Sequence, residues 1–130
     1  MANRDIEGPI LRSIISYLRM VLPGNPLIHH CANEFGMSGK DVARQIAKNK
    51  HNGMLPGFPD ILVLPFASVG PMLFEVKAPG GKPTPAQDAV HVDMTRLGYR
   101  VAVVRSIDDV RAKLDEWGVW RSDAGRAVQS

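Results

Sequence analysis

Three charged side chains border the most apolar part of this 130-residue chain. Asp60 immediately precedes one apolar run, ILVL, while Glu75 and Lys77 close a second one, MLFEVK. Both runs read as strands, and successive strand residues point to opposite faces, so Glu75 and Lys77 share one face and Val76 points to the other. Buried charge costs several kcal/mol unless it is paired or bound to metal. The stretch from Pro56 to Lys77 is therefore the first candidate for a site.

These residue types suit a divalent metal ion. Hard cations such as Mg²⁺ take oxygen ligands and keep several waters. Asp60 and Glu75, on neighbouring strands, can each supply a carboxylate oxygen, and the main-chain carbonyl of Val76 is placed to supply a third. Lys77 can then orient a metal-bound water or stabilise charge that develops on a phosphate.

A plainer interpretation of the same pattern is a surface ion pair. Asp…Glu-x-Lys spacing also arises by chance, and a pair between Glu75 and Lys77 on an exposed strand would be worth roughly 0–1 kcal/mol. The residues around Glu75 are apolar, which is not typical of an exposed strand. The metal site is the favoured interpretation.

A third acid, Glu7, stands near the start of an amphipathic helix expected over residues 5–22. Apolar residues recur there at three- and four-residue spacing, namely Ile10, Leu11, Ile14, Ile15 and Leu18. Glu7 extends this stripe by one turn, so its carboxylate can join the site. Two helix starts are open. Either Asp5 caps the helix and Pro9 lies in the first turn, or Gly8 caps it and Glu7 is only an acid near the positive helix end.

The rest of the chain alternates between short apolar runs and helical periodicity. In chain order we expect a strand at 27–31, a helix at 38–50, the two strands around the candidate site, a helix from Thr84 to Gly98, a strand at 100–104 and a helix from Ser106 to Gly118. Helices on both faces of a small mixed sheet make a three-layer α/β domain. We expect one domain at residues 1–120 and a flexible polar tail at 121–130.

Basic residues follow the expected second helix toward Asp60. They fall near four-residue intervals and continue into the next loop: Lys40, Arg44, Lys48 and Lys50. Such a row is either a solvated helix face or a patch that binds phosphates beside the site. Lys82, in the loop after the second strand, is a further candidate for DNA binding.

Two other patterns do not lead to a site. His29, His30 and Cys31 are adjacent, so a strand would point them to opposite faces, and no second ligand cluster follows at zinc spacing. Gly81-Lys82 is similar to the end of a P-loop, but Pro83 stands where that motif needs Ser or Thr. We expect neither a structural zinc nor a nucleotide-binding loop.

The overall composition is that of an ordinary globular protein, 45% hydrophobic and 22% charged. The single cysteine, Cys31, excludes an intramolecular disulfide and fits the reducing cytoplasm. The N-terminal residues have no signal-peptide pattern, and the apolar stretch 61–74 is too interrupted for a membrane helix. A net charge of +3 permits a nucleic-acid partner. We therefore expect a cytoplasmic protein without a membrane partner.

Taken together, the motifs resemble the VRR-NUC domain of the PD-(D/E)xK nuclease superfamily. The motifs that carry the resemblance are Gly57-Phe58-Pro59-Asp60, Phe74-Glu75-Val76-Lys77, the glycine-rich loop that follows, Gln87, and Gly98 before an apolar strand. The chain is similar to the standalone bacterial and phage members. The resemblance implies a restriction-endonuclease-like αβββαβ core, dependence on Mg²⁺ or Mn²⁺, and hydrolysis of DNA phosphodiester bonds. It also implies a homodimer that cuts four-way (Holliday) junctions.

The resemblance also implies roles for single residues. Asp60 and Glu75 match the metal-binding acids, Lys77 the catalytic lysine, Glu7 the acid of the first helix, and Gln87 a glutamine of the site. Gln87 has a competing role, because Thr84-Pro85-Ala86-Gln87 is a capping box at a helix start. A side chain folded back to cap the helix is not expected to reach the metal as well, and we favour the role in the site.

Two other functions remain open from the sequence. One is a nuclease or nickase that acts on linear, flap or single-stranded DNA. The other is a DNA-binding module on the same fold without catalysis, against which the intact Asp60, Glu75 and Lys77 argue.

Overall fold

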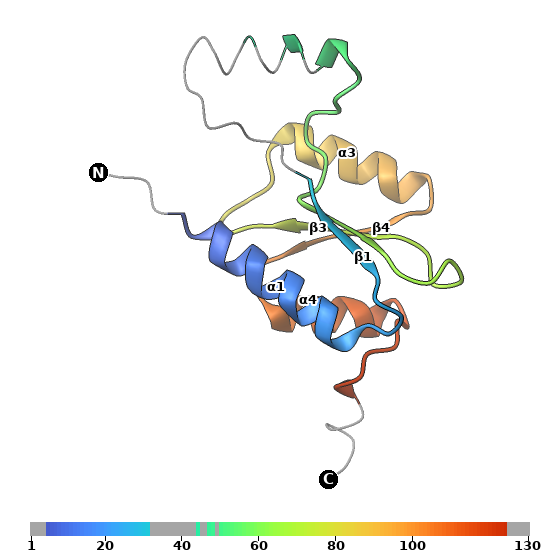
Figure 1. Cartoon of the computed structure of the whole chain (residues 1–130). Coiled ribbons are helices and arrows are strands. Elements are labelled where there is room, and N and C mark those ends of the chain that lie inside the picture. Colours follow the sequence, from blue (N-terminus) through green and yellow to red (C-terminus); the bar gives the residue numbers. More distant parts are fainter. Residues whose placement is uncertain (1–4, 32–43, 45–46, 49, 125–130) are drawn as a thin grey trace.

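The structure is a computed structural model that describes residues 5–31, 44, 47–48 and 50–124 (Figure 1). Its elements are, in chain order, α1 (Glu7–Val21), β1 (Leu27–His30), β2 (Ile61–Leu64), β3 (Met72–Val76), α3 (Pro85–Arg96), β4 (Arg100–Val104) and α4 (Ile107–Glu116). The first six follow the predicted αβββαβ order, and α4 is added after them. None of the described helices is long and apolar enough to cross a membrane.

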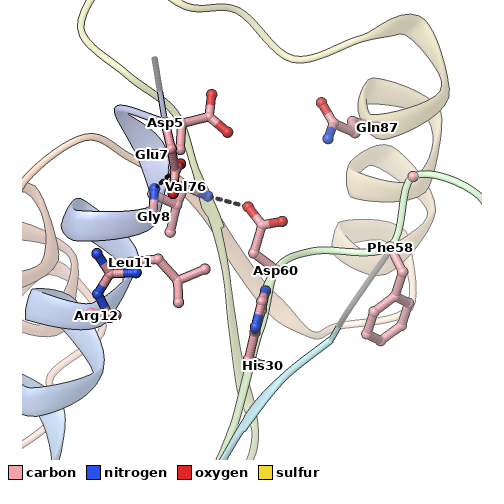
Figure 2. A pocket seen from close by; sticks show the side chains of 11 residues that line it. Asp5, Glu7, Gly8, Leu11, Arg12, His30, Phe58, Asp60, Val76 and Gln87 are labelled. Carbon is pink, nitrogen blue, oxygen red and sulfur yellow. Dashed lines mark hydrogen bonds between the residues drawn. The ribbon is translucent and has the colours of Figure 1, made fainter. Parts of the chain in front are cut away.

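The described strands form one mixed sheet in the order β1-β2-β3-β4. β2 pairs antiparallel with both β1 and β3, whereas β3 and β4 run parallel. β3 is thus an inner strand, and all five of its residues are buried. Antiparallel pairing places the start of β2 beside the end of β3, so the side chain of Asp60 reaches Val76 (Figure 2).

Helices cover both faces of this sheet (Figure 1). α1 and α4 lie on one face, where Phe74 and Val76 belong to the larger apolar core. α3 lies on the other face, where Leu73 packs with Val90 and Met94. Glu75 is two residues beyond Leu73 and therefore points toward α3. The three predicted layers are confirmed, and the site belongs to the α3 side of the sheet.

The start of α1 is close to the first of the two predicted alternatives, although the N-cap residue is Ile6, one position after Asp5. The helix begins at Glu7, and Asp5 Oδ1 accepts a hydrogen bond from the N–H of Gly8 at 2.8 Å. Pro9 lies in the first turn, where its missing N–H has no helical partner to lose. Glu7 is consequently a helical residue, and its side chain is exposed rather than turned into the core.

The apolar residues of the helix expected from Thr84 to Gly98 predict an inward face, and this prediction overestimates how much of α3 is buried. The predicted inward residues are Ala86, Val90, Met94 and Leu97. Val90 and Met94 pack against the sheet as expected, but Ala86 is exposed and Leu97 is 61% exposed. Only the middle turns of the helix contact the apolar residues of the sheet. The predicted inward positions at the two ends of α3 are therefore wrong.

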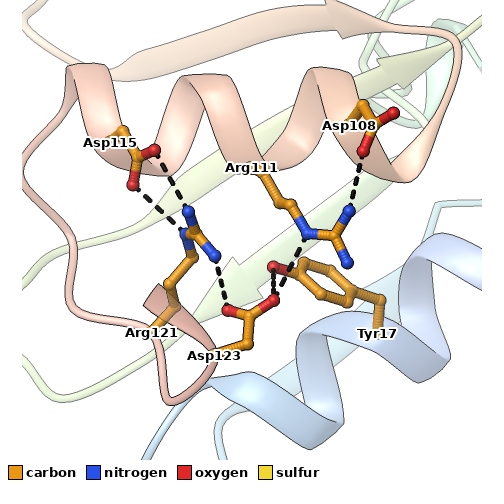
Figure 3. A network of polar contacts seen from close by, with 6 residues as sticks. All are labelled: Tyr17, Asp108, Arg111, Asp115, Arg121 and Asp123. Atoms are coloured by element: carbon orange, nitrogen blue, oxygen red, sulfur yellow. Dashed lines mark hydrogen bonds and ion pairs between the residues drawn. The ribbon is translucent and has the colours of Figure 1, made fainter. Parts of the chain in front are cut away.

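The packed part of the chain extends past the predicted boundary at residue 120. Asp123 Oδ2 accepts from the Tyr17 hydroxyl of α1 at 2.8 Å, and its Oδ1 accepts from Arg121 at 2.7 Å (Figure 3). Asp123 also pairs with Arg111 of α4. Residues 121–124, which the sequence gives to the tail, thus link α1 to α4, and residues 125–130 lie outside the described part.

Candidate active site

Asp60 is fixed from both neighbouring strands. Its Oδ2 accepts a hydrogen bond from the Val76 N–H at 2.7 Å (Figure 2), and its own main-chain carbonyl accepts from the Cys31 N–H at 2.7 Å. The N–H and C=O of one strand residue point to the same side, so the Val76 carbonyl also faces the Asp60 side of β3. This arrangement gathers the predicted ligands Asp60 and Val76 at one strand end.

The turn before Asp60 packs closely against the first residues of α3. Gly57 has a φ of +87°, and a Cβ added there would lie 2.5 Å from the main-chain oxygen of Ala86. Only glycine combines this backbone conformation with so close an approach. Pro59, directly before Asp60, is buried. The Gly-Phe-Pro-Asp motif thus sets the distance between Asp60 and α3.

Glu75 is the one buried charged residue in the described part of the chain, with 1% of its surface exposed. Its Oε2 accepts from the Gln87 amide nitrogen at 3.0 Å, whereas its Oε1 has no hydrogen-bond partner among the described residues. Burial and the interaction with the neighbouring Asp60 carboxylate raise the pKa of Glu75 to about 9. Without a compensating cation, this carboxyl therefore holds a proton at neutral pH.

Lys77 and Glu7 lie where the chain leaves β3. Lys77 is half-buried and makes no ion pair with any carboxylate of the described residues, so the plainer interpretation, a Glu75–Lys77 pair, is absent there. Its positive charge lowers the pKa of Glu75 and thereby opposes the rise caused by burial. Glu7 Oε2 accepts a long hydrogen bond of 3.4 Å from the N–H of Ala78, one residue further on. The start of α1 thus meets the end of the predicted motif.

Gln87 performs both of the roles that the sequence treats as competing. Its Oε1 accepts from the Thr84 N–H at 2.9 Å while the Thr84 hydroxyl accepts from the Gln87 N–H, which completes the capping box. The same amide donates from Nε2 to Glu75. Capping therefore does not keep Gln87 from Glu75, because the oxygen of its amide caps the helix while the nitrogen contacts the carboxylate.

A pocket of about 490 Å³ opens beside Asp60, between the starts of α1 and α3 (Figure 2). Four predicted site residues line it, namely Glu7, Asp60, Val76 and Gln87. Glu75 and Lys77 are not among its lining residues. Arg12 and His30 line the pocket as well and were not predicted. Arg12 stands four residues after Gly8, another lining residue, and this helical spacing would have indicated Arg12. His30, by contrast, depends on its pairing with Ile61 in the sheet.

His91 is a further residue that the sequence analysis missed. Its Nε2 lies 3.6 Å from Glu75 Oε1, whereas Gln87 contacts the other oxygen, Oε2. Burial lowers the pKa of His91, which favours a neutral imidazole. The sequence places His91 on the same face of α3 as Gln87, four residues away, but it does not show that this face turns toward Glu75.

The donor set fits a small hard cation. Asp60, Glu75 and the Val76 carbonyl offer only oxygen atoms, and Glu75 Oε1 is buried without a hydrogen-bond partner that a described residue could supply. The described ranges hold no group of three His, Cys, Asp or Glu side chains close enough to bind a metal ion. Two carboxylates suffice for Mg²⁺, which keeps several waters and also binds substrate phosphates.

The structure describes all but one of the predicted DNA-binding residues. Lys40 lies outside the described residues, whereas Arg44, Lys48 and Lys50 are helical and exposed. Lys82 is exposed in the loop between β3 and α3. Arg105 donates to the Gly81 carbonyl at 2.6 Å and so holds that loop in place.

Comparison with models of protein families gives one match that contains most of the site. The model of the VRR-NUC domain matches residues 12–108, a stretch that contains Asp60, Glu75, Lys77 and Gln87. The chain belongs to the VRR-NUC domain family. Glu7 precedes the matched stretch, so its place at the site rests on the geometry described above.

Solved structures support the fold of this VRR-NUC domain. One, described as a VRR_NUC domain protein, superposes with a TM-score of 0.64 at 21% identity and covers 89% of this chain and 90% of its own. Another, described as a VRR_NUC domain, gives a TM-score of 0.55 at 25% identity, with coverages of 87% and 97%. No curated protein sequence matches the chain. The chain thus has the nuclease fold of its family.

Proposed function

We propose that this VRR-NUC domain is a metal-dependent DNA endonuclease that hydrolyses phosphodiester bonds. The observation that carries the proposal is Glu75, a buried carboxyl with one oxygen lacking a described partner, placed beside Asp60 at the end of the central strand. A carboxyl group in the interior either holds a proton or needs a bound cation to compensate its charge. The nuclease fold of the family supplies the reaction class.

The position of each side chain in the site determines its proposed role. Asp60, Glu75 and the Val76 carbonyl would hold Mg²⁺ or Mn²⁺, which when bound activates a water and offsets negative charge on the phosphate. Lys77 orients the attacking water and stabilises the charge that builds on the phosphate oxygens. Glu7, at the rim of the pocket, holds a water or supplies one more oxygen.

The proposed substrate is branched DNA, held through its phosphates. Arg44, Lys48, Lys50 and Lys82 are exposed cations, and Lys40 extends the row in the sequence. Contacts to phosphate position DNA without reading its sequence. A homodimer with two-fold symmetry would present two such sites to the two equivalent strands of a four-way junction.

The test compares DNA shapes at constant sequence. Single-turnover cleavage is measured on a four-way junction, a linear duplex, a flap and a single strand, each with Mg²⁺, Mn²⁺ or EDTA. We expect paired nicks in the junction with either cation and none in EDTA. Equal rates on the linear, flap or single-stranded DNA would keep the nuclease and reject junction specificity.

Two further measurements complete the test. Tight DNA binding without Mn²⁺ binding or cleavage would reject catalysis in favour of a DNA-binding module. Light scattering is expected to give twice the chain mass of 14.2 kDa. A monomer that cleaves junctions would overturn the two-fold arrangement but not the chemistry.

A further inference from the structure

Two buried polar atoms face each other behind the metal-binding acids, and neither has a hydrogen-bond partner among the described residues. They are Oε1 of Glu75 and Nε2 of His91, and they lie 3.6 Å apart. The His91 side chain is 14% exposed and that of Glu75 1%. Buried polar atoms are nearly always satisfied, so a pair of unsatisfied ones in direct opposition calls for an explanation.

Packing alone does not explain a histidine at this position. The neighbouring helix residue Val90 and the next turn's Met94 fill the space between α3 and the sheet with apolar side chains. An apolar residue at position 91 would complete that layer without burying a ring nitrogen. The separation of 3.6 Å is a few tenths of an ångström beyond a hydrogen bond, so a small movement of either side chain closes it.

The geometry points to His91 as a positioning residue for Glu75, with its Nε2–H donating to Oε1 when the carboxylate is bound to the cation. Gln87 already donates to Oε2 from the preceding turn of the same helix. With both contacts formed, α3 holds each oxygen of the carboxylate from behind. Each oxygen keeps a second lone pair, so the orientation toward Asp60 and the Val76 carbonyl is fixed while coordination remains free.

This role deepens the proposed function and rests on its metal site. Residues that hydrogen-bond to ligating carboxylates orient them, and their loss typically weakens metal binding by about 10- to 100-fold. His91 would act only through Glu75, so its effect belongs in cation affinity and not in the stability of the metal-free protein. A role limited to packing would give the opposite result.

The experiment measures Mn²⁺ affinity by calorimetry and the free energy of unfolding in EDTA for the full chain. His91→Leu and His91→Phe remove the donor and keep an apolar filler. His91→Gln places an amide nitrogen near the position of Nε2. Val92→Ala, at an exposed position on the same helix, is the matched control.

We expect His91→Leu and His91→Phe to bind Mn²⁺ about 10-fold or more weakly than wild type, with unfolding free energies in EDTA equal to or above that of wild type. His91→Gln and Val92→Ala should bind within about threefold of wild type. Two variants that lack the hydrogen-bond donor are used, so that the test still holds if one of them does not fold.

The failures of the inference and of the proposed function are distinguishable. If wild type binds Mn²⁺ and a folded His91→Leu or His91→Phe variant binds it equally well, the role of His91 is overturned and the proposed metal site is not. Wild type that does not bind Mn²⁺ at all overturns the proposed metal site and this inference with it.

Discussion

The protonation of Glu75 determines, at the scale of single residues, the state of the site before a cation binds. Burial and the neighbouring Asp60 raise its pKa to about 9, so the metal-free carboxyl is neutral at pH 7. A cation that binds there must displace this proton. Metal affinity should therefore increase with pH, as it does wherever protons compete with the metal for a ligand.

The raised pKa predicts how the stability of the metal-free protein depends on pH. Between the ordinary value of 4.5 and about 9, the folded state binds one proton that the unfolded state releases. The contribution of Glu75 to the free energy of unfolding is thus fully present below pH 4.5. It is lost as the pH rises through 9, at up to about 1.4 kcal/mol per pH unit. Urea unfolding in EDTA measures it.

Glu75→Gln supplies the control for that prediction, because it keeps the shape of the side chain and cannot titrate. The difference in unfolding free energy between the variant and wild type should shift in favour of the variant as the pH rises from 5 to 9. A difference that is constant across this range would contradict the raised pKa.

The two roles of Gln87 can be separated by comparing it with its capping partner. Thr84→Ala removes only the cap and should lower the unfolding free energy by about 1 kcal/mol, with Mn²⁺ affinity unchanged. Gln87→Ala should cost a similar amount and also weaken Mn²⁺ binding by about 10-fold, since Glu75 loses its Oε2 donor. Calorimetry and urea unfolding measure both quantities. Equal Mn²⁺ affinities in the two variants would limit Gln87 to capping.

At the scale of elements, the site depends on how closely the turn before β2 approaches α3. Gly57 faces the first turn of α3 with no room for a side chain, and Asp60 follows three residues later. The approach therefore controls the distance from Asp60 to the residues that α3 contributes.

Gly57→Ala tests this contact, with Gly70→Ala as the matched control. Both glycines have a positive φ, +87° and +89°, but a Cβ at Gly70 would meet nothing within 4 Å. Each change should cost about 1–2 kcal/mol for the left-handed backbone. Gly57→Ala should cost roughly 2 kcal/mol more, because its Cβ would collide with the main chain of Ala86, and should weaken Mn²⁺ binding, as measured by urea unfolding and calorimetry. Equal losses would show that the turn does not need to approach α3 closely.

The turn after α4 is the second element that the site depends on, because it anchors α1. Asp123 bonds to Tyr17 of α1 and to Arg111 and Arg121 (Figure 3). Asp123→Ala should lower the unfolding free energy by about 1–2 kcal/mol. Ser122→Ala, which keeps its main-chain bond to Val21, should have no measurable effect in the same urea titration. Identical midpoints would show that the turn adds nothing to stability.

The sequence predicts most of the elements because each has a local signal. β4 has the predicted bounds, Arg100–Val104, since a continuous apolar run between two capped helices leaves little choice. Ser106 caps α4 as expected, and its hydroxyl accepts from the Asp109 N–H. Asp60, directly before β2, and Glu75, in β3, come together because the hairpin that joins them is short.

What the sequence does not predict depends on contacts between distant parts. The role of His91 requires knowing that α3 turns the face of Gln87 toward Glu75. The exposure of Leu97 follows from where the sheet ends, and the packing of Asp123 from the meeting of α1 and α4. Periodicity within a segment contains none of this information.

At the scale of the whole molecule, the two faces of the sheet have different tasks. The face covered by α1 and α4 holds the larger apolar core and supplies stability. The face covered by α3 has a smaller apolar cluster and carries Glu75, Gln87 and His91. The larger core on the α1 and α4 face thus offsets the free energy lost by burying Glu75 on the α3 face, as the proposed nuclease requires.

The most direct test of this account is cation-dependent cleavage of a four-way DNA junction by wild type and by variants of the site. Asp60→Ala and Lys77→Ala should each cut at least about 100-fold more slowly than wild type in Mn²⁺. The controls are Lys113→Ala and Glu116→Ala, which change a surface pair on α4 and should cut like wild type. Wild-type rates in both Asp60→Ala and Lys77→Ala would contradict the proposed active site.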